Sequence, residues 1–304
     1  MNFLADYSQV TFAGLDKVFE VPAVAFQFTL PFGNGTEITI RWYGIIIALG
    51  YTLAVLFGGR MAYTWKMSIN KMIDVLIYGT FGGIVGARAF YVIFQWDYYS
   101  LHPAEIFRLW EGGLAIYGGI IGGLIAAFIT CRLEKLSFTK LLDLAGMSLL
   151  IGQSIGRWGN FMNQEAFGTN TTLPWGMTSD KVVNYILRNQ AFFEEHNIEM
   201  NPNVPVHPTF LYESLWCALG FVLLYIICKK FKRFDGQLFL GYGIWYAIGR
   251  AIIEGLRTDS LYIGTLRISQ LISILIAVIF TALYILFTIR YIKSKKTESS
   301  AAGE

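Results

Sequence analysis

Charged residues are scarce in this chain. Asp, Glu, Lys and Arg make up 15% of its 304 residues, whereas they make up about 25% of soluble domains. Hydrophobic residues make up 55%, and the formal net charge is only +3. The scarcity of charge excludes an ordinary soluble domain, and the small net charge gives no support to nucleic-acid binding. The composition therefore predicts a polytopic membrane protein.

Cysteine and histidine are also scarce, with three residues of each. Cys131, Cys217 and Cys228 lie inside apolar segments or at their ends, so the sequence predicts no external disulfide. The histidines lack the spacing of metal ligands, which argues against a zinc site. No P-loop is present, and no strand precedes a glycine cluster as a dinucleotide fingerprint requires. We therefore expect neither a metal nor a cofactor.

We also expect no removable signal peptide, because the start MNFLADYSQV has no basic run before an apolar segment and no small-residue cleavage site. The chain instead contains seven apolar windows, each long enough to cross about 30 Å of hydrocarbon. We expect an all-α membrane protein with seven transmembrane helices, forming one integral membrane domain over residues 1–304. The windows are Trp42–Gly59, Met72–Phe94, Gly113–Thr130, Leu141–Trp158, Phe210–Cys228, Leu238–Gly255 and Ile268–Ile289.

Lysine and arginine are concentrated in alternate loops, which predicts an N-terminus outside and a C-terminus in the cytoplasm. The segment 159–208, between the fourth and fifth windows, is too long for a simple connector. We expect it to form an outer loop or a small head region. Its charged middle, Ser179–Glu199, predicts an amphipathic helix on the outer membrane surface.

Glycines four residues apart recur in the second, third and fourth windows. Such small-xxx-small spacing lets helices approach closely, so we expect these residues to serve helix packing. The pairs are Gly79/Gly83, Gly82/Gly86, Gly118/Gly122, Gly119/Gly123 and Gly152/Gly156.

Polar residues collect in the outer half of the predicted helices. Arg157 ends the fourth window, and the sixth carries a stripe in which Tyr246, Arg250, Glu254 and Arg257 recur at helical spacing. An arginine at the centre of a membrane helix costs about 2.5–3.5 kcal/mol on insertion scales, so it normally faces a polar cavity, a partner or an anion. The alternative is that Arg250 and Glu254 form an ion pair that only helps packing.

Arg88, late in the second window, also fits two interpretations. It contacts substrate in one, and in the other it is a structural clamp paired with Asp97 or Glu105. Two or more arginines in a membrane cavity suit a phosphate, because the guanidinium group forms bidentate, charge-assisted bonds. A phospholipid head group supplies such a phosphate.

Residues near Arg157 fit the same ligand. Asn160, Asn163 and Glu165 are suited to hold hydroxyls of a head group, and Tyr43 or Tyr117 to donate a hydrogen bond to an oxyanion. For the two asparagines, hydrogen bonding within the loop is the alternative.

The run GRWGNFMNQEAFG, from Gly156 to Gly168, closely resembles the signature of the bacterial phosphatidylglycerol–prolipoprotein diacylglyceryl transferase family. The resemblance extends over most of the chain in order and spacing. The further matching runs are IRWYG at Ile40–Gly44, GARAFYVIF at Gly86–Phe94, EGGLAIYGG at Glu111–Gly119, HPTFLYE at His207–Glu213 and GRAIIEGLR at Gly249–Arg257.

This resemblance implies an enzyme of the bacterial cytoplasmic membrane, with its active site in the outer half. The family transfers the sn-1,2-diacylglyceryl group of phosphatidylglycerol to the lipobox cysteine of a prolipoprotein, next to its signal peptide. A thioether forms and glycerol phosphate is released. The expected partners are therefore phosphatidylglycerol and the prolipoprotein.

Residue roles follow from the matching motifs. Arg157, on the phosphate, binds the head group together with Asn160, Glu165 and Gly168, and Arg250 is the second essential arginine. Glu254 and Arg257 orient or extend this group, and Tyr43 lines the cavity. We include Tyr246 and Arg88 among the expected substrate contacts.

The chain departs from the family at Tyr117, where many members carry a histidine that is often proposed as the base. Tyrosine, with a pKa near 10, is a poor base at neutral pH, so we expect Tyr117 to donate a hydrogen bond. The base is then His207 or Glu165, or the thiolate forms without one. His207 has a structural alternative, as a cap of the helix that follows it.

Two other classes of protein would also place polar groups in a membrane. An organic-anion or lipid transporter is the main alternative, but such proteins often show internal repeats and a midplane site. The two halves of this chain show no repeat, and the polar residues are biased outward. A receptor or scaffold has no need for a GRxGNFxNxE cluster.

Overall fold

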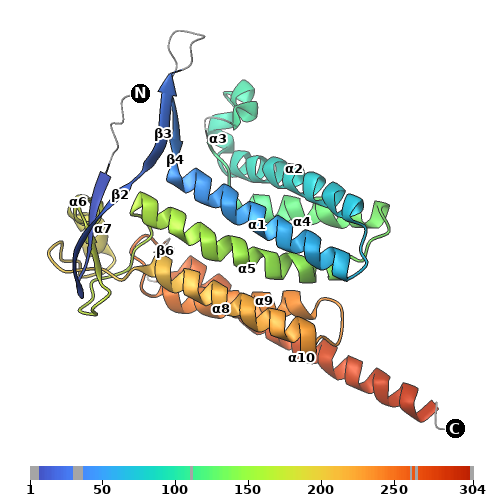
Figure 1. Ribbon diagram of the computed structural model, residues 1–304. Coiled ribbons are helices and arrows are strands. Elements are labelled where there is room, and N and C mark those ends of the chain that lie inside the picture. Colours follow the sequence, from blue (N-terminus) through green and yellow to red (C-terminus); the bar gives the residue numbers. More distant parts are fainter. Residues whose placement is uncertain (1–6, 30–36, 110–111, 261, 264–265, 302–304) are drawn as a thin grey trace. The chain divides into compact units, whose positions relative to one another are not determined.

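A computed structural model describes residues 7–29, 37–109, 112–260, 262–263 and 266–301 (Figure 1). Among these residues, seven long helices occupy the positions of the seven predicted windows. They are α1 (Trp42–Thr64), α2 (Ile69–Phe94), α4 (Ile116–Leu133), α5 (Phe138–Asn163), α8 (Thr209–Lys230), α9 (Gln237–Glu254) and α10 (Ile268–Ala301).

Five helices in the described part of the chain are long and apolar enough to cross a membrane, namely α1, α2, α4, α8 and α10. The helices α5 and α9 are less apolar, because α5 carries Gln153 and Arg157 and α9 carries Arg250 and Glu254. The chain is thus mostly helical and is a membrane protein. The two less apolar helices bring polar side chains to a common site.

The chain is not all-α, and in this respect the prediction was wrong. The strands β1 (Tyr7–Phe12), β2 (Leu15–Pro22) and β5 (Met177–Ser179) form an antiparallel sheet in the order β2-β1-β5. In β1, Ser8 and Val10 are buried while Tyr7 and Gln9 are exposed, the alternation of a strand with one packed face. Such a short alternating pattern gives no signal in a search for long apolar windows.

Two smaller antiparallel pairs complete the described strands. The pair β3 (Val24–Thr29) and β4 (Glu37–Arg41) leads directly into α1. The pair β6 (Tyr262–Ile263) and β7 (Leu266–Arg267) precedes α10. Short helical turns, α3 (Trp96–Tyr99) and η1 (Pro103–Phe107), connect α2 to α4.

The segment between α5 and α8 contains the helix that its charge pattern predicted. It forms as two pieces, α6 (Asp180–Arg188) and α7 (Gln190–Glu195). Ser179 caps α6 by accepting a hydrogen bond from the Val182 amide at 3.3 Å, and Asp180 and Arg188 lie at the helix ends that favour their charges.

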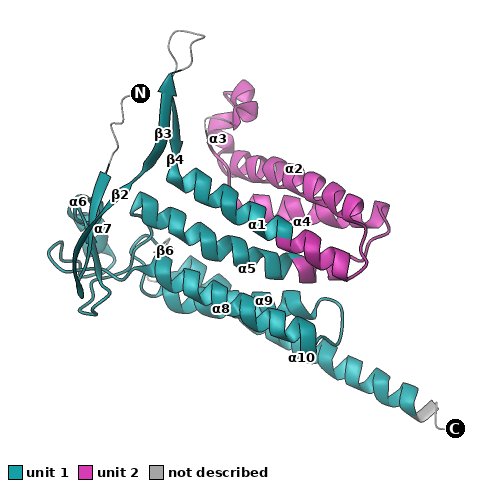
Figure 2. Ribbon diagram, viewed as in Figure 1, with its two compact units in different colours: residues 1–56, 145–304 teal, residues 57–144 magenta. Residues whose placement is uncertain are grey.

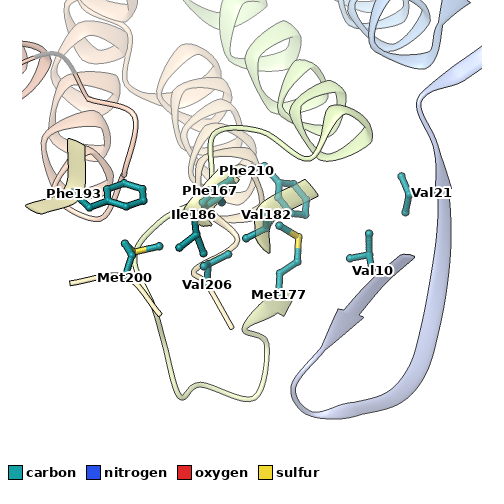
Figure 3. Packing of buried hydrophobic residues seen from close by; sticks show 10 residues of the cluster. All are labelled: Val10, Val21, Phe167, Met177, Val182, Ile186, Phe193, Met200, Val206 and Phe210. Carbon is teal, nitrogen blue, oxygen red and sulfur yellow. The ribbon is translucent and has the colours of Figure 1, made fainter. Parts of the chain in front are cut away.

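A cluster of buried apolar side chains holds this segment together (Figure 3). It joins β1, β2, β5, α6 and α7 to the start of α8. Phe167 and Phe210 belong to it and flank the polar ends of α5 and α8, so the cluster fixes where those ends lie. Its members are Val10, Val21, Phe167, Met177, Val182, Ile186, Phe193, Met200, Val206 and Phe210.

The chain forms two compact units (Figure 2). The first comprises residues 1–56 and 145–304, and the second comprises residues 57–144. In the first unit, Gly50 of α1 lies against Gly152 of α5, since a Cβ added at Gly50 would be 3.2 Å from the Gly152 carbonyl oxygen. The predicted packing role of Gly152 is therefore realised against α1.

In the second unit, α2 and α4 pack through their glycines. A Cβ added at Gly86 would lie 2.4 Å from the Gly118 carbonyl oxygen, and one added at Gly122 would lie 2.3 Å from the Gly82 carbonyl oxygen. The two backbones are in contact, so no larger residue fits. The predicted role of these glycines in helix packing is confirmed.

Replacing Gly86 by alanine is therefore expected to lower the thermal unfolding midpoint of the protein in detergent, because overpacking costs about 1–3 kcal/mol. Gly59→Ala in α1 is the matched control, since no atom lies within 4 Å of its added Cβ. That control should be neutral or slightly stabilising, as alanine is the better helix former. An unchanged or raised midpoint in Gly86→Ala would contradict the packing role.

Candidate functional site

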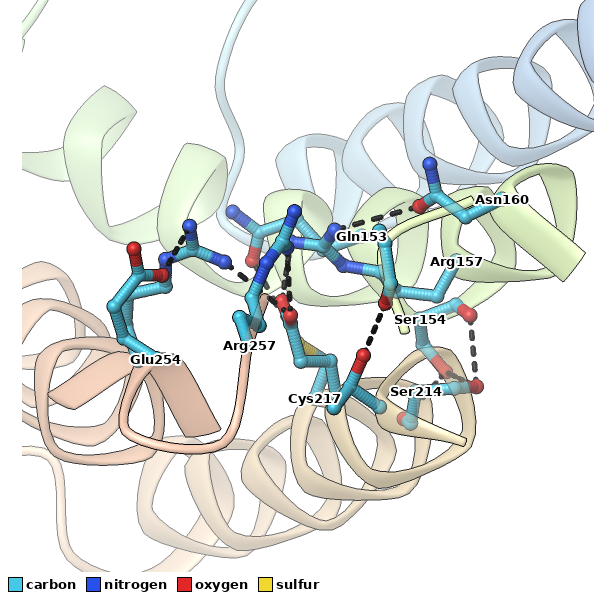
Figure 4. Close-up of polar contacts among 12 residues, drawn as sticks. Gln153, Ser154, Arg157, Asn160, Ser214, Cys217, Glu254 and Arg257 are labelled. Carbon is cyan, nitrogen blue, oxygen red and sulfur yellow. Dashed lines mark hydrogen bonds and ion pairs between the residues drawn. The ribbon is translucent and has the colours of Figure 1, made fainter. Parts of the chain in front are cut away.

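The candidate site is organised around Glu213, which is buried in the second turn of α8. Arg157, near the end of α5, pairs with its Oε2. Arg250 of α9 and Arg257, just after α9, approach its Oε1 at 3.2 and 3.3 Å (Figure 4). We call Arg157, Arg250 and Arg257 the arginine cluster. One carboxylate thus brings together three of the residues predicted from the sequence.

Two further carboxylates balance the charge of the arginine cluster. Glu254 Oε2 lies 2.6 Å from Arg250 Nη2. Asp259 accepts two hydrogen bonds from Arg257, at 2.9 Å from Nε and 2.7 Å from Nη2. With Glu213, three carboxylates face three guanidinium groups. Pairing of this kind allows charges to be buried, because an unpaired buried charge is strongly destabilising.

The pair formed by Arg257 and Asp259 is charged at neutral pH. Burial alone would lower the pKa of Arg257, but the hydrogen bonds and charge of Asp259 raise it. Burial alone would likewise raise the pKa of Asp259, but its hydrogen bonds with Arg257 and the charge of that arginine lower it. Both groups keep their charges across the physiological range.

The arginine cluster keeps accessible edges. The side chains of Arg157 and Arg250 retain 20% and 18% of their exposure, against 6% for Glu213. A guanidinium group has five N–H donors, and the ion pairs described here use only some of them. The cluster is therefore able to accept an anion while remaining paired with its carboxylates.

A chain of amide side chains extends from Arg157. Its Nη1 donates to Asn160 Oδ1 at 3.4 Å, and Asn160 Nδ2 donates to Glu165 Oε1 at 2.9 Å. Asn163 donates to the same oxygen at 3.3 Å. The predicted hydrogen bonding within the loop is thus present, and it places the exposed Glu165 carboxylate next to the arginine cluster.

Gly168 lets two other segments meet at the site. Its amide donates to the His207 carbonyl at 2.9 Å, and it forms a bridge with Arg257. A Cβ at this position would lie 2.8 Å from His207 Cβ and 3.0 Å from the Leu256 carbonyl oxygen. Glycine is therefore required here, because the chain before α8 and the chain after α9 are both in contact with it.

His207 lies two residues before the start of α8 and is half-buried. Its Nδ1 lies 3.0 Å from the Tyr212 hydroxyl, which accepts a hydrogen bond from Trp175 Nε1 at 2.7 Å. Burial lowers the pKa of His207 below its usual value, so the ring is neutral at pH 7. The helix cap is Pro208, with no side-chain cap bond, so the ring of His207 does not act as the predicted cap. No hydrogen bond or ion pair joins that ring to the arginine cluster within the described residues.

Two of the predicted tyrosines, Tyr43 and Tyr246, lie in this unit on α1 and α9. The ring of Tyr43 in α1 lies against Gly159, where an added Cβ would be 2.9 Å from its Cδ2. Tyr246 stacks on Tyr242, with ring centroids 5.9 Å apart. The Tyr242 hydroxyl accepts a hydrogen bond from Gln153 of α5 at 2.9 Å, which ties α5 to α9.

Arg88 and Tyr117 belong to the second unit. Arg88 is buried, and its guanidinium donates to main-chain carbonyls at 2.5–3.0 Å rather than to the carboxylates of Asp97 or Glu105. These bonds make Arg88 a structural clamp, but its partners are main-chain carbonyls and not the predicted carboxylates. A substrate contact stays a prediction. Tyr117 lies exposed in the first turn of α4. Glu111, where its motif begins, lies outside the described residues. The main-chain carbonyls that accept hydrogen bonds from Arg88 belong to Glu105, Ile106, Gly112 and Gly113.

Sequence reasoning did not assign Glu213, Asp259 or Gln153 to the site. Glu213 gave a signal, since it is the single acidic residue of α8, and a lone charge in an apolar helix calls for a partner. Asp259 and Gln153 lie among ordinary polar residues and gave none.

The fold and the site define an integral membrane protein with a buried, charge-balanced arginine site. The model of the family described as prolipoprotein diacylglyceryl transferase matches residues 32–286, and the chain belongs to this family of enzymes. The resemblance found in the sequence is therefore confirmed.

Relatives named phosphatidylglycerol–prolipoprotein diacylglyceryl transferase agree with the family match. The protein of Finegoldia magna is 46% identical over 84% of this chain and 95% of its own length. Those of Listeria monocytogenes and Limosilactobacillus reuteri are 44% and 43% identical, over 80% and 88% of this chain and 84% and 90% of their own lengths.

Glu213→Gln tests the central role of this carboxylate. We expect a loss of about 3–5 kcal/mol in unfolding free energy, because removing one partner of a buried ion pair leaves uncompensated charge. Glu134→Gln is the control, as its pair with Lys71 is partly exposed at 3.5 Å, and an exposed pair contributes about 0–1 kcal/mol. Equal effects of the two substitutions on thermal unfolding in detergent would refute the central role.

Proposed function

We propose that this protein transfers the sn-1,2-diacylglyceryl group of phosphatidylglycerol to the lipobox cysteine of prolipoproteins, forming a thioether and releasing glycerol phosphate. The observation that carries the proposal is the convergence of Arg157, Arg250 and Arg257 on one buried carboxylate, with accessible edges left for a phosphate. Family membership and the names of the relatives support the same reaction.

The head group of phosphatidylglycerol matches the polar groups of the site. Arg157 and Arg250 bind the phosphate through charge-assisted hydrogen bonds, and Arg257 extends this positive surface. Asn160 and Glu165 bind hydroxyls of the glycerol. Tyr43 lines the site, with its ring packed on Gly159.

The reaction requires a thiolate. The sulfur attacks the glyceryl carbon that carries the phosphate, a C–S bond forms, and the C–O bond to the phosphate breaks with its electron pair on oxygen. The departing phosphate changes from a diester with one negative charge to a monoester with up to two. The arginine cluster stabilises this added charge, which is an electrostatic form of catalysis.

The proton of the thiol needs an acceptor, because a free thiol has a pKa of about 8.5. Neutral His207 is suited to this role, and the Tyr212 hydroxyl holds its ring through Nδ1. Glu165 is the alternative acceptor, since it is exposed and bonded to Asn160. Tyr117 is a hydrogen-bond donor in either case.

The proposal includes the arrangement in the membrane. All seven long helices cross the bilayer, including the less apolar α5 and α9. The N-terminus is outside, the C-terminus is cytoplasmic and the site lies in the outer half of the bacterial cytoplasmic membrane. Residues 159–208 form the outer head region. The lysines and arginines concentrated in alternate loops support this orientation. Family membership does not favour the transporter alternative.

Purified protein is expected to add one diacylglyceryl unit to a peptide containing Leu-Ala-Gly-Cys when phosphatidylglycerol is supplied, with release of glycerol phosphate. Arg157→Ala should lower the rate about 10²–10³-fold, the effect of removing one oxyanion donor. Arg290→Ala, in the C-terminal part of α10, should leave the rate unchanged. Peptide mass and glycerol phosphate are both measured, and a folded wild type that transfers nothing would refute the proposed function.

The acid side of the pH profile tests His207. As the base it acts in its neutral form, and its pKa is lowered, so kcat/KM should fall only when the pH drops well below about 6.5. His207→Ala should remove this limb and lower the rate at pH 7 by about 10²-fold or more. A His207→Ala variant with the wild-type rate would exclude His207 as the base. The base would then be Glu165, or the thiolate would form without a dedicated base.

A further inference from the structure

A cavity of about 670 Å³ lies beside the arginine cluster, and its lining residues on α6 have no part in the reaction described above. Its walls come from the turn after α5, from α6 and from the segment after α9. Gln164 and Glu165 form one side, Lys181 and Arg188 of α6 form another, and Asp259 closes the third. Its volume is typical of pockets that hold small ligands or short segments of chain.

The polar groups of this cavity are mixed in kind. Glu165 and Asp259 are acceptors, whereas Lys181 and Arg188 are donors, and the amide of Asn184 offers both. The formal charges of the four ionised groups cancel. A simple anion would meet two carboxylates here, and a simple cation would meet two bases. A peptide main chain suits the cavity better, because each residue presents one N–H donor and one C=O acceptor.

Gln164 gives independent support for a ligand that donates hydrogen bonds. Its side chain is 4% exposed, and its Nε2 donates to the Phe161 carbonyl. That bond requires the nitrogen to face Phe161, and it leaves Oε1 buried without a hydrogen-bond partner among the described residues. An unsatisfied buried acceptor is destabilising. A ligand N–H would satisfy it after a small movement of the side chain.

The backbone of the same wall is held in an uncommon conformation. Gln164 and Ala166 have φ angles of 57° and 56°, in the left-handed region that residues other than glycine rarely adopt. Such conformations persist where the surrounding structure imposes them, and they cluster at functional sites. Here they turn the chain so that Gln164, Glu165 and Ala166 all line the cavity.

Two walls of the cavity are shared with the candidate active site. Glu165 accepts a hydrogen bond from Asn160, which in turn accepts one from Arg157. Asp259 is the bidentate partner of Arg257. A chain segment in the cavity is therefore one side chain away from the arginine cluster, close enough for an adjoining residue to reach the lipid.

The acceptor substrate has two unlike sides around its cysteine. The residues before the cysteine end an apolar signal sequence, which suits the apolar helices. The residues after it begin the secreted protein and need partners for their main-chain polar groups. Of the two sides, only the second matches a cavity that carries four ionised groups.

We propose that this cavity binds the main chain of the prolipoprotein residues that directly follow the lipobox cysteine. The proposal rests on the proposed function. Lys181, Arg188 and Asn184 bind peptide carbonyls, while Gln164 and Asp259 accept from peptide amides. Binding there places the cysteine thiol beside Glu165 and the arginine cluster.

The test compares two peptide acceptors. The short peptide ends in Leu-Ala-Gly-Cys-amide, and the long peptide continues for four serine and asparagine residues. The variant is Asn184→Ala/Arg188→Ala, which changes two cavity residues of α6 outside the proposed catalytic groups. Leu187→Ala is the control, because this exposed residue lies on the same helix and does not line the cavity.

The variant is expected to raise KM for the long peptide about tenfold, since it loses hydrogen bonds to the main chain of that peptide. The kcat/KM of the variant for the short peptide and its KM for phosphatidylglycerol should match those of the wild type. In Leu187→Ala, these two constants and the KM for the long peptide should all match those of the wild type. Unchanged transfer to the short peptide also shows that the variant is folded. If the double variant does not fold, Arg188→Ala alone, with its exposed side chain, takes its place.

Other results overturn the proposal. Equal kinetic changes for both peptides, or no change for the long one, would show that the cavity does not bind the residues after the cysteine. Altered inhibition by glycerol phosphate without a change in peptide KM would assign the cavity to the released product. Transfer to neither peptide by the folded wild type would instead refute the proposed function itself, which separates the two failures.

Discussion

The contact between Glu213 and three arginines is the interaction on which the rest of the site depends. It joins α5, α8 and the end of α9, and it makes the burial of three cations tolerable in an apolar protein. The amide chain through Asn160 and the turn at Gly168 add to this centre from one side. Asp259 and Glu254 complete it from the other. Without Glu213, three cations would share the two carboxylates of Glu254 and Asp259, and Arg157 would lose the ion pair described above.

The long helices were predictable from the sequence because hydrophobicity over some twenty residues is a local property. The glycine contacts of α2 and α4 and the amphipathic α6 were predictable for the same reason, since their signals repeat at helical spacing. The strands β1 and β5 were not predicted. Strand pairing joins residues far apart in the chain, and Met177 of β5 is paired with Phe12 of β1.

The sequence selected several residues that the structure brings together, but it did not predict which of them contact one another. The stripe predicted for the sixth window placed Arg250, Glu254 and Arg257 on one face, although α9 ends at Glu254. The motif in α5 selected Arg157 and Asn160. The partner that unites them, Glu213, lies on a third helix, and no periodicity specifies which helices become neighbours. Arg88 illustrates the same limit, because its sequence context suggested carboxylate partners whereas its donors bind main-chain carbonyls.

The charged residues of the site come from α5, α8 and the end of α9, so the order in which these segments are synthesised matters. Synthesis proceeds from the N-terminus, so α5 with Arg157 is made before α8 with Glu213, and the two remaining arginines are made last. An arginine in a membrane helix is costly until its partner is present. Until α8 is made, Arg157 therefore lacks the carboxylate that offsets the cost of burying it. The contacts around Glu213 therefore form late in synthesis, after the segments that carry the three arginines have been made.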